Sequence, residues 1–208
     1  MHDSRGDRQI SGEGFASVPG LGYGGSPGGR SAFSSDGRTL FYLVRKRGSR
    51  PFNSAELRIA DLDSGRTAAA LPGVLMSDFD IAPDGELVTF EEAGHVWVAS
   101  LDRSTPPRQL TSSVSFRPFF GPGGDIYFQA NESGRTFVYS VGPDEAMPRK
   151  INPEPVAVVR YFAPWRLVAL RLEPSDRPPN TRRVPVSRLR FLQRRVGTWP
   201  QVILCKIP

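Results

Sequence analysis

The sequence predicts an all-β protein assembled from repeated four-stranded antiparallel units. Three observations support this fold class. One turn phrase occurs three times, short β-type runs surround each copy, and Gly and Pro are abundant, with 21 and 20 of the 208 residues. Many turn residues and no segment of convincing helical period favour short strands over helices.

The repeated phrase has the chemistry of a tight hairpin turn. "IAPDGELVTF" begins at Ile81, a near-copy "FSSDGRTLFY" begins at Phe33, and a looser copy "FGPGGDIYFQ" begins at Phe120. In Ala82-Pro83-Asp84-Gly85, Pro fixes φ for the second position of a type I turn and Asp suits the third. Gly then accepts the positive φ at the exit. Each phrase is therefore expected to join two antiparallel strands.

The runs around these turns have the period of strands. Val96 and Val98 alternate with Trp97 and Ala99, for example, and each run is too short for a helix. The expected strands lie at 39–44, 56–62, 86–90, 95–101, 125–130 and 136–141. Each hairpin is followed by a third strand, a second turn and a short fourth run such as "RQLTS". The turn phrases are 48 and 39 positions apart, and a four-stranded unit of about this length is typical of a β-propeller blade.

The segment "IAPDGELVTFEEAGHVWVASLDRSTPPRQLTSS" resembles the TolB-like propeller repeat, a relative of the WD40-like blade. The units that begin at Ser31 and Arg117 match the same pattern less closely, and the resemblance covers about 125 of 208 residues. It implies a partial β-propeller of about three blades. The same repeat occurs in translocation proteins, sensor domains and peptidase accessory domains, so it specifies architecture better than function.

Charge divides the chain into parts. Residues 1–29 read as a flexible Gly/Ser/Pro-rich leader and residues 30–155 as the blades. Residues 1–155 carry a net charge of −3, whereas 156–208 carry +9, with ten Arg and a single Gly. A nucleic-acid partner is therefore not expected for the patterned region. The basic tail is open to three interpretations: a degenerate blade, a segment produced by a reading-frame slip, or a basic arm.

Motifs that suggest catalysis or nucleotide binding fail on their context. "GGSPG" at Gly24 to Gly28 fits a nucleophile elbow around Ser26, but Pro27 has no N–H for an oxyanion hole. "GLGYGG" at Gly20 to Gly25 follows no strand and opens no helix, so a dinucleotide site is not expected. The single cysteine, Cys205, lies in the tail.

Acidic and histidine residues also carry no clear site. Asp61-x-Asp63 and Asp78-x-Asp80 begin like calcium loops, yet later ligand positions are missing. His95 lies close to Glu91 and Glu92, which leaves a His–Glu pair open but favours a hairpin tip. We therefore expect no catalytic, cofactor-binding or metal-binding residues and no cofactor.

The expected function is that of a non-enzymatic propeller fragment that acts as a protein- or peptide-binding scaffold. The alternative is an accessory or sensor propeller of a larger kinase-like or prolyl-oligopeptidase-like protein whose catalytic domain is absent. Contact is expected through loops 45–55 and 131–135. A basic cluster in the first of them favours an acidic partner, and its members are Arg45, Lys46, Arg47 and Arg50.

Three blades cannot close a propeller, so missing blades or a partner chain are expected to complete it. The sequence shows no signal peptide and no apolar run of membrane-spanning length. The compartment is therefore open, periplasmic or cytoplasmic if the chain belongs to a larger protein.

Overall fold

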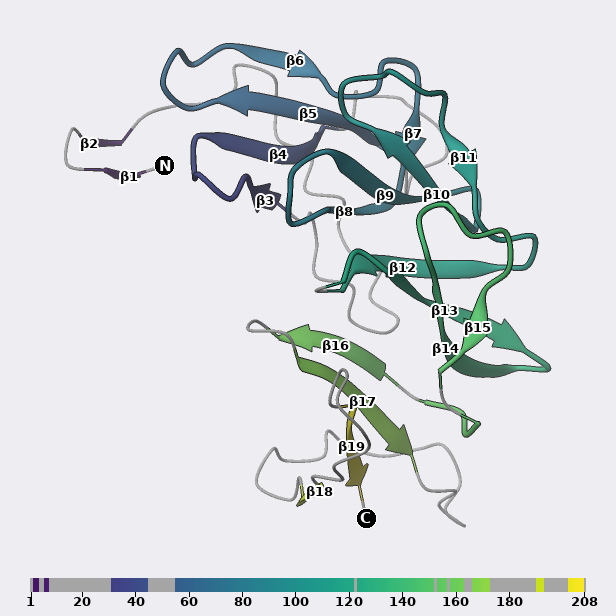
Figure 1. Cartoon of the computed structure of the whole chain (residues 1–208). Helices are drawn as coiled ribbons and strands as arrows, with labels where there is room; N and C mark the ends of the chain where they lie inside the picture. Colours follow the sequence, from purple (N-terminus) through teal and green to yellow (C-terminus); the bar gives the residue numbers. More distant parts are fainter. Residues whose placement is uncertain are drawn as a thin grey trace.

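Three consecutive antiparallel sheets form the body of the protein in a computed structural model (Figure 1). The structure describes residues 2–3, 6–7, 31–44, 55–121, 123–151, 153–156, 158–162, 166–172, 190–192 and 202–207. Before residue 31 and after residue 156 it describes the backbone alone. The described residues contain no helix, so none of them forms a helix that could cross a membrane.

Each of the three sheets is a blade whose strands follow chain order from the inner strand outward. Blade 1 contains β3 (Ser31–Phe33), β4 (Thr39–Val44), β5 (Ala55–Asp61) and β6 (Thr67–Ala69), and the short β7 (Leu75–Met76) also pairs with β5. Blade 2 contains β8 (Asp78–Ile81), β9 (Leu87–Glu92), β10 (His95–Ser100) and β11 (Arg108–Gln109). Blade 3 contains β12 (Ser115–Phe120), β13 (Ile126–Glu132), β14 (Arg135–Val141) and β15 (Arg149–Lys150). The predicted all-β fold, a partial propeller of four-stranded antiparallel blades, is confirmed.

Two further sheets are described by their backbone. β1 (His2–Asp3) pairs with β2 (Gly6–Asp7). The fourth large sheet contains β16 (Val158–Phe162), β17 (Arg166–Leu172), β18 (Arg190–Leu192) and β19 (Val202–Ile207). It begins as an antiparallel hairpin of β16 and β17, but β19 then pairs with β17 in parallel. This sheet therefore departs from the strand order of the three blades.

The repeated phrase forms the predicted hairpin turns. The amide N–H groups of Gly37, Gly85 and Gly124 donate to the carbonyl three residues earlier, at 2.9, 2.8 and 3.1 Å. All three glycines have φ between 70° and 85°, where an L side chain would be strained. The turn of blade 3 is one residue shorter than the other two, because Gly121 pairs with Asp125 whereas Ala82 pairs with Leu87.

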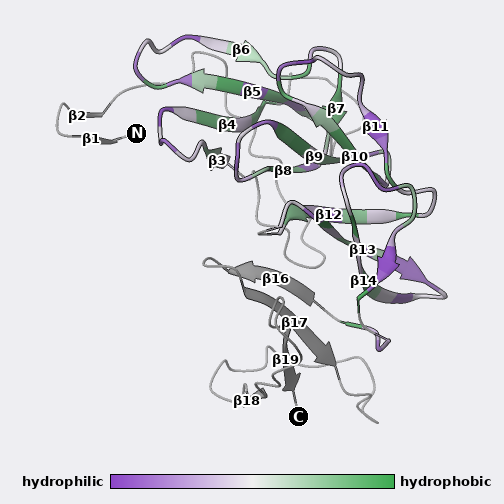
Figure 2. Ribbon diagram, viewed as in Figure 1, coloured by the Kyte–Doolittle hydropathy of each residue, from purple (hydrophilic) through white to green (hydrophobic). Residues whose placement is uncertain are grey.

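Strand alternation divides each blade into two faces that pack against its neighbours. On blade 2, Val88 and Phe90 belong to a core cluster shared with Phe41 and Leu57 of blade 1. Val96 and Val98 belong to a second cluster, which contains residues of blade 3. Figure 2 shows the central strands as hydrophobic and the outer strands β11 and β15 as hydrophilic. The core therefore consists of two seams between adjacent blades.

Candidate functional site: a groove between the second and third blades

A hollow lies between the outer part of blade 2 and the middle strands of blade 3. It has a volume of about 530 Å³, within the range of pockets that hold small ligands or short peptide segments. One wall is the segment 109–113, which contains the end of β11 and the connection to blade 3. The other wall is formed by β13, β14 and the segment 146–148. We call this hollow the interblade groove.

The floor of the groove is aromatic because alternate residues of β13 and β14 point to the same side. Phe128 lies directly opposite Tyr139, and their rings stack with centroids 5.7 Å apart and planes inclined by 15°. Leu110 and Ala130 complete the apolar part of the lining. Phe128 is buried and supports the half-buried ring of Tyr139, which is the aromatic surface that a ligand could contact.

Charge in the groove is nearly balanced. Glu132 is the one charged residue of the lining, and it accepts a hydrogen bond from Lys150 Nζ at 2.6 Å. The same ammonium group lies 3.9 Å from the centre of the Phe137 ring, in cation–π geometry. A neutral, largely apolar ligand therefore fits the groove better than a phosphate-rich one.

Two features of the rim matter for binding: hydrogen bonds from Arg108 and Gln109, and the exposed side chain of Met147. Gln109 Nε2 donates to the carbonyl of Thr111 at 2.5 Å, and Arg108 donates to the carbonyl of Glu145 at 3.2 Å. The first bond lies within one wall, and the second joins β11 of blade 2 to the segment that leads into the other wall. Met147 is 82% exposed beside Pro148, and a flexible exposed thioether is a common element of adaptable binding surfaces.

Of the two loops predicted to contact a partner, loop 131–135 is described by the structure, and loop 45–55 is almost entirely outside the described residues. In loop 131–135, Asn131 and Glu132 line the interblade groove, so the loop lies at the site that the geometry singles out. Ser133 and Gly134 turn the chain there with φ of 49° and 75°. Residues 45–54, which include the predicted basic cluster, lie outside the described residues between the end of β4 and the start of β5.

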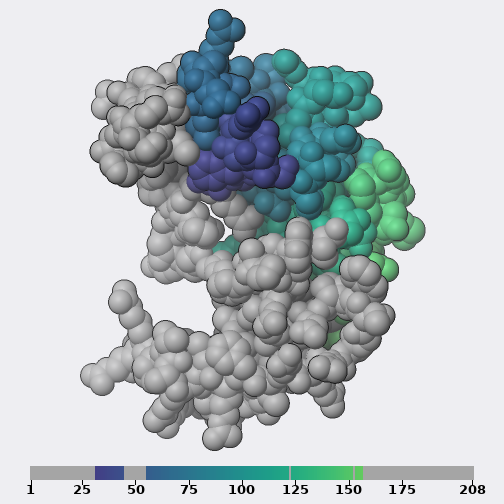
Figure 3. All heavy atoms as spheres, turned by 60° about the vertical axis from the view of Figure 1, so that its left-hand side comes forward, coloured from purple at the N-terminus to yellow at the C-terminus, as the bar shows by residue number. Residues whose placement is uncertain are grey.

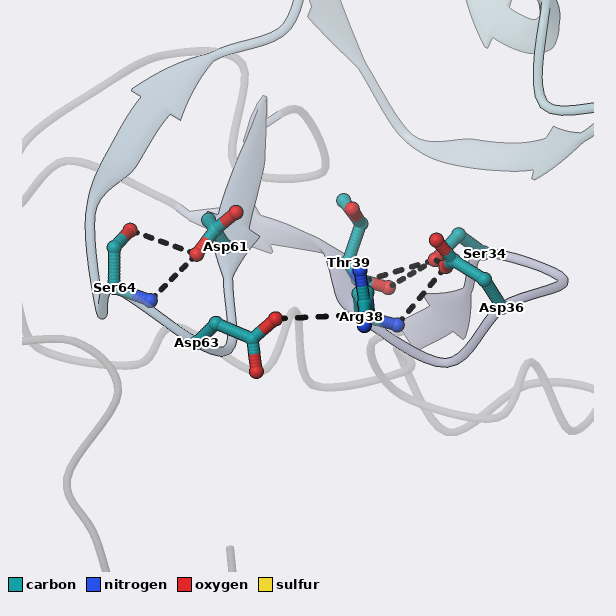
Figure 4. Close-up of polar contacts among 7 residues, drawn as sticks. All are labelled: Ser34, Asp36, Arg38, Thr39, Asp61, Asp63 and Ser64. Carbon is teal, nitrogen blue, oxygen red and sulfur yellow. Dashed lines mark hydrogen bonds and ion pairs between the residues drawn. The ribbon is translucent and has the colours of Figure 1, made fainter.

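The first of the two aspartate pairs that resemble calcium loops, Asp61 and Asp63, lies in a turn of blade 1 (Figure 4). Asp61 Oδ1 accepts hydrogen bonds from the amide and the hydroxyl of Ser64, at 2.6 and 2.7 Å. These bonds lower the pKa of Asp61, while Asp63 forms an ion pair with Arg38 at 3.7 Å. Within the described ranges, no group of three His, Cys, Asp or Glu residues could hold a metal ion.

The same turn chemistry recurs at another turn of blade 1 and at a turn of blade 2. Asp36 accepts hydrogen bonds from Ser34 Oγ and from the amide of Arg38, and these bonds lower its pKa. Asp102 accepts from Ser100 Oγ and from the amide of Ser104, which lower its pKa to about 2. These carboxylates are therefore committed to local structure.

Asp80 and Glu91, which the sequence raised as members of a calcium loop and of a His–Glu pair, instead form hydrogen bonds across the seam between blades 2 and 3. Asp80 Oδ2 accepts a hydrogen bond from the amide of Phe120 at 2.8 Å. Glu91 Oε2 accepts from the amide of Arg117 at 3.4 Å, where Arg117 has a φ of 56°. Burial raises the pKa of Glu91 above its ordinary value, although the Arg117 bond opposes the rise. The signal in the sequence that could have indicated these links is a carboxylate within a strand, at a position where the alternation of the strand predicts an apolar side chain.

The remaining candidates that the sequence raised are a histidine–glutamate pair, two glycine-rich motifs and a cysteine. His95 lies opposite Glu92 in the β9–β10 pairing, on the side of blade 2 that faces blade 1. Glu91 occupies the other face, so the structure does not bring it together with His95. Ser26 and Gly20–Gly25 lie outside the described residues, and Cys205 lies in β19, where the backbone alone is described.

Comparisons with known proteins agree with the fold. No family model matches the sequence, and no curated protein matches it. A structure assigned to TolB from Agrobacterium tumefaciens has 18% identity and a TM-score of 0.50 over 60% of this chain and 46% of that one. TolB from Acinetobacter baumannii has 14% identity and a TM-score of 0.45 over 67% of this chain and 39% of that one.

An oligogalacturonate lyase in complex with manganese has 18% identity and a TM-score of 0.46 over 60% of this chain and 41% of that one. The chain therefore spans less than half the length of each of these three proteins. At these identities the likeness concerns the fold alone, which is that of an incomplete TolB-like β-propeller.

Proposed function

We propose that the chain is a non-enzymatic propeller scaffold that binds a protein partner, and that the interblade groove holds an extended, largely uncharged peptide segment of that partner. The observation that carries this proposal is the groove itself. Its floor is a stacked Phe128–Tyr139 pair, its rim bears the exposed Met147, and its one lining charge is already paired.

An extended peptide suits the shape of the site better than a compact ligand. One wall of the groove contains the end of the two-residue strand β11, and the segment 146–148 of the other wall leads into the two-residue strand β15. Both are exposed and basic at their edges, which discourages strand addition by long β-segments. A short segment can instead place apolar side chains on the aromatic floor, as in the recognition of Pro-rich peptides by aromatic-lined grooves.

The experiment is a binding titration of the full chain with an array of short fluorescent peptides that vary in apolar, proline and charged content. We expect neutral apolar peptides to bind and acidic or basic ones to bind weakly. Tyr139→Ala and Met147→Asp should each weaken binding by about tenfold or more, because they remove contact area at the centre and the rim. Val114→Asp is the matched control, since Val114 is exposed but lies outside the groove lining.

Two further arms separate the rival functions. The same preparation is assayed with ester, peptide and nucleotide substrates, and turnover that persists in a purified sample contradicts the non-enzymatic assignment. A second titration uses an acidic peptide against wild type and a variant with Arg45, Lys46, Arg47 and Arg50 changed to Ser. Equal binding by the two proteins would remove the basic cluster from the partner surface.

A further inference from the structure

An ammonium group lies over the aromatic edge of blade 3, and it belongs to the chain itself. Lys150 Nζ lies 3.9 Å from the centre of the Phe137 ring and 5.6 Å from the centre of the Tyr139 ring. It also donates a hydrogen bond to Glu132 Oε2 at 2.6 Å. Ring faces together with a carboxylate are the groups with which proteins hold ammonium ligands. We call Glu132, Phe137 and Tyr139 the ammonium cage.

The members of the ammonium cage come together because they share one face of blade 3. Phe137 and Tyr139 are two positions apart in β14, so their rings point to the same side. Ala130 lies opposite Phe137, and Glu132 follows two positions later on the same face. Lys150 lies opposite Tyr139 in the pairing of β14 with β15. Because Glu132 and Tyr139 also line the interblade groove, the cage is continuous with the groove.

The position of Lys150 allows its ammonium group to exchange with another cation. Lys150 belongs to β15, an outer strand of two residues, and 35% of its side chain is exposed. The chain around β15 is bright green in Figure 3 and lies at the surface of that view. Ion pairs between exposed side chains are weak, so rotation of the lysine side chain into water costs little. Phe137 is 9% exposed beneath the ammonium, and departure of the lysine would uncover its ring.

The charge of the ammonium cage depends on whether Lys150 occupies it. With Lys150 in place, the carboxylate of Glu132 is already paired, and a second cation at this end of the groove would be repelled by the first. Without the Lys150 amine, Glu132 would be an unpaired carboxylate beside two ring faces. The same end of the groove would then attract an ammonium group rather than repel it.

We propose that the end of the interblade groove is an ammonium-binding site that Lys150 occupies as an internal ligand, and that this occupancy makes the groove select neutral peptides. The inference rests on the proposed peptide-binding function and deepens it by naming the residue that excludes basic peptides. A ligand ammonium must compete with an amine that is tethered to the site and so has a high effective concentration. Removal of the Lys150 amine converts the groove into one that selects a lysine side chain or another ammonium.

The first experiment compares apolar peptides, acetylated and amidated at their termini, that differ only in carrying lysine or the uncharged norleucine at one end. The pair is made twice, with the variable residue at either end, because either end of a peptide can lie at the ammonium cage. Fluorescence titration of the full chain measures each affinity. Wild type should prefer norleucine, whereas Lys150→Ala should bind a lysine peptide about tenfold more tightly than wild type does. Equal affinity of the two proteins for both lysine peptides would overturn the inference.

Further variants separate the ammonium cage from the net charge of the chain. Lys150→Arg keeps a cation on β15 and should retain the wild-type preference, whereas Glu132→Gln added to Lys150→Ala should abolish the gain for lysine. Arg149→Ala is the matched control, because Arg149 adjoins Lys150 in β15 but lies on the other face, opposite Ser140. Its ion pair with Asp125, at 3.2 Å, is lost in the same way. A gain for lysine in Arg149→Ala equal to that in Lys150→Ala would assign the effect to net charge and refute the cage.

A titration without peptide distinguishes failure of this inference from failure of the proposed function. Methylammonium chloride, compared with equal sodium chloride, should raise the unfolding temperature of Lys150→Ala more than that of wild type or Arg149→Ala. Such a rise without binding of any peptide would support the ammonium site and refute the peptide site. Binding of neutral peptides without the rise, and without a gain for lysine, would refute the ammonium site alone. Far-UV circular dichroism checks the fold of each protein, and Lys150→Ser replaces Lys150→Ala if the latter is unfolded.

Discussion

The two seams between the blades of this partial propeller are packed in different ways. The seam between blades 1 and 2 is closed by apolar side chains, among them Phe79 and Phe90, which are fully buried. The seam between blades 2 and 3 adds two carboxylates, Asp80 and Glu91, that accept hydrogen bonds from the backbone of β12. At the equivalent positions blade 1 has Ala32 and Leu43, which pack against the first seam.

The two kinds of contact affect the stability of a seam and the relative position of its two blades differently. Apolar burial stabilises a seam in proportion to area but tolerates small shifts between the sheets. A carboxylate that accepts from one particular amide fixes the relative position of two blades, at the cost of placing charge near the core. The second seam borders the interblade groove, so a fixed register there also fixes the width of the groove.

The largest expected effect concerns the apolar seam. Phe79→Ala should lower the free energy of unfolding by about 3–5 kcal/mol, because it leaves a cavity in a fully enclosed core. Urea denaturation of the full chain measures the change. Phe33→Ala is the control, since a side chain that is half exposed in one chain contributes far less to its folding. Equal losses for the two variants would contradict the description of the seam.

The next effect concerns the polar seam. Asp80→Ala should cost about 1.5–3 kcal/mol, because the amide of Phe120 loses a charged acceptor. Asp80→Asn keeps an acceptor oxygen of the same reach and should recover part of the loss. Urea denaturation again provides the measurement, and an Asn variant no better than Ala would mean that the hydrogen bond to Phe120 is unimportant.

A smaller effect is expected at the turn of blade 3. A Cβ at Gly121 would lie 2.5 Å from Cε2 of Tyr127, closer than real contacts allow. Gly121→Ala should therefore destabilise the chain by about 1–3 kcal/mol through overpacking. Gly123→Ala is the matched control in the same turn, because a Cβ at Gly123 meets nothing within 4 Å. Thermal unfolding of the two variants should separate them clearly.

The smallest expected effect is on how the free energy of unfolding depends on pH, and it tests the burial of Glu91 directly. The pKa of Glu91 is raised in the folded state, mainly by burial, so its ionisation opposes folding. Its contribution to stability should improve as pH falls through the raised folded value toward the ordinary value near 4.5. Glu91→Gln should remove this dependence and stabilise the chain near neutral pH. Thermal unfolding from pH 4 to 8 tests the sign, and a variant whose stability follows that of wild type at every pH would exclude Glu91 as its source.

The turns and blades could be predicted because their physics is local. Pro83, Asp84 and Gly85 specify a turn by their own backbone preferences, and alternation in β9 and β10 specifies strands without knowledge of neighbours. The seam between blades 2 and 3 could not be predicted in this way. Asp80 and Phe120 are 40 positions apart, and their contact depends on how one sheet is placed on the next.

One part of the candidate site, loop 131–135, could be predicted from local sequence. Loop 131–135 was identified because its small and charged residues have no core role, and two of them line the interblade groove. The aromatic floor was missed. Phe128 and Tyr139 look like ordinary core residues in the sequence, and Phe128 is indeed buried. Their place in the lining of the groove depends on how the segment 109–113 lies beside blade 3, which local sequence does not specify.

The shorter turn of blade 3 has a consequence for protein engineering. Its hairpin loses one residue between the paired strands, yet Ile126 and Phe128 still face the preceding blade as Val88 and Phe90 do. Side-chain direction in these hairpins is thus counted from the last paired residue and is insensitive to loop length. We therefore expect the hairpin turns to be exchangeable between blades. The turn of blade 3 could replace that of blade 2, or a longer turn could be inserted there, and the side chains of the flanking strands would still face the same neighbouring blades. Any recombination of these blades should therefore be aligned on their paired residues, and never on an ungapped sequence match.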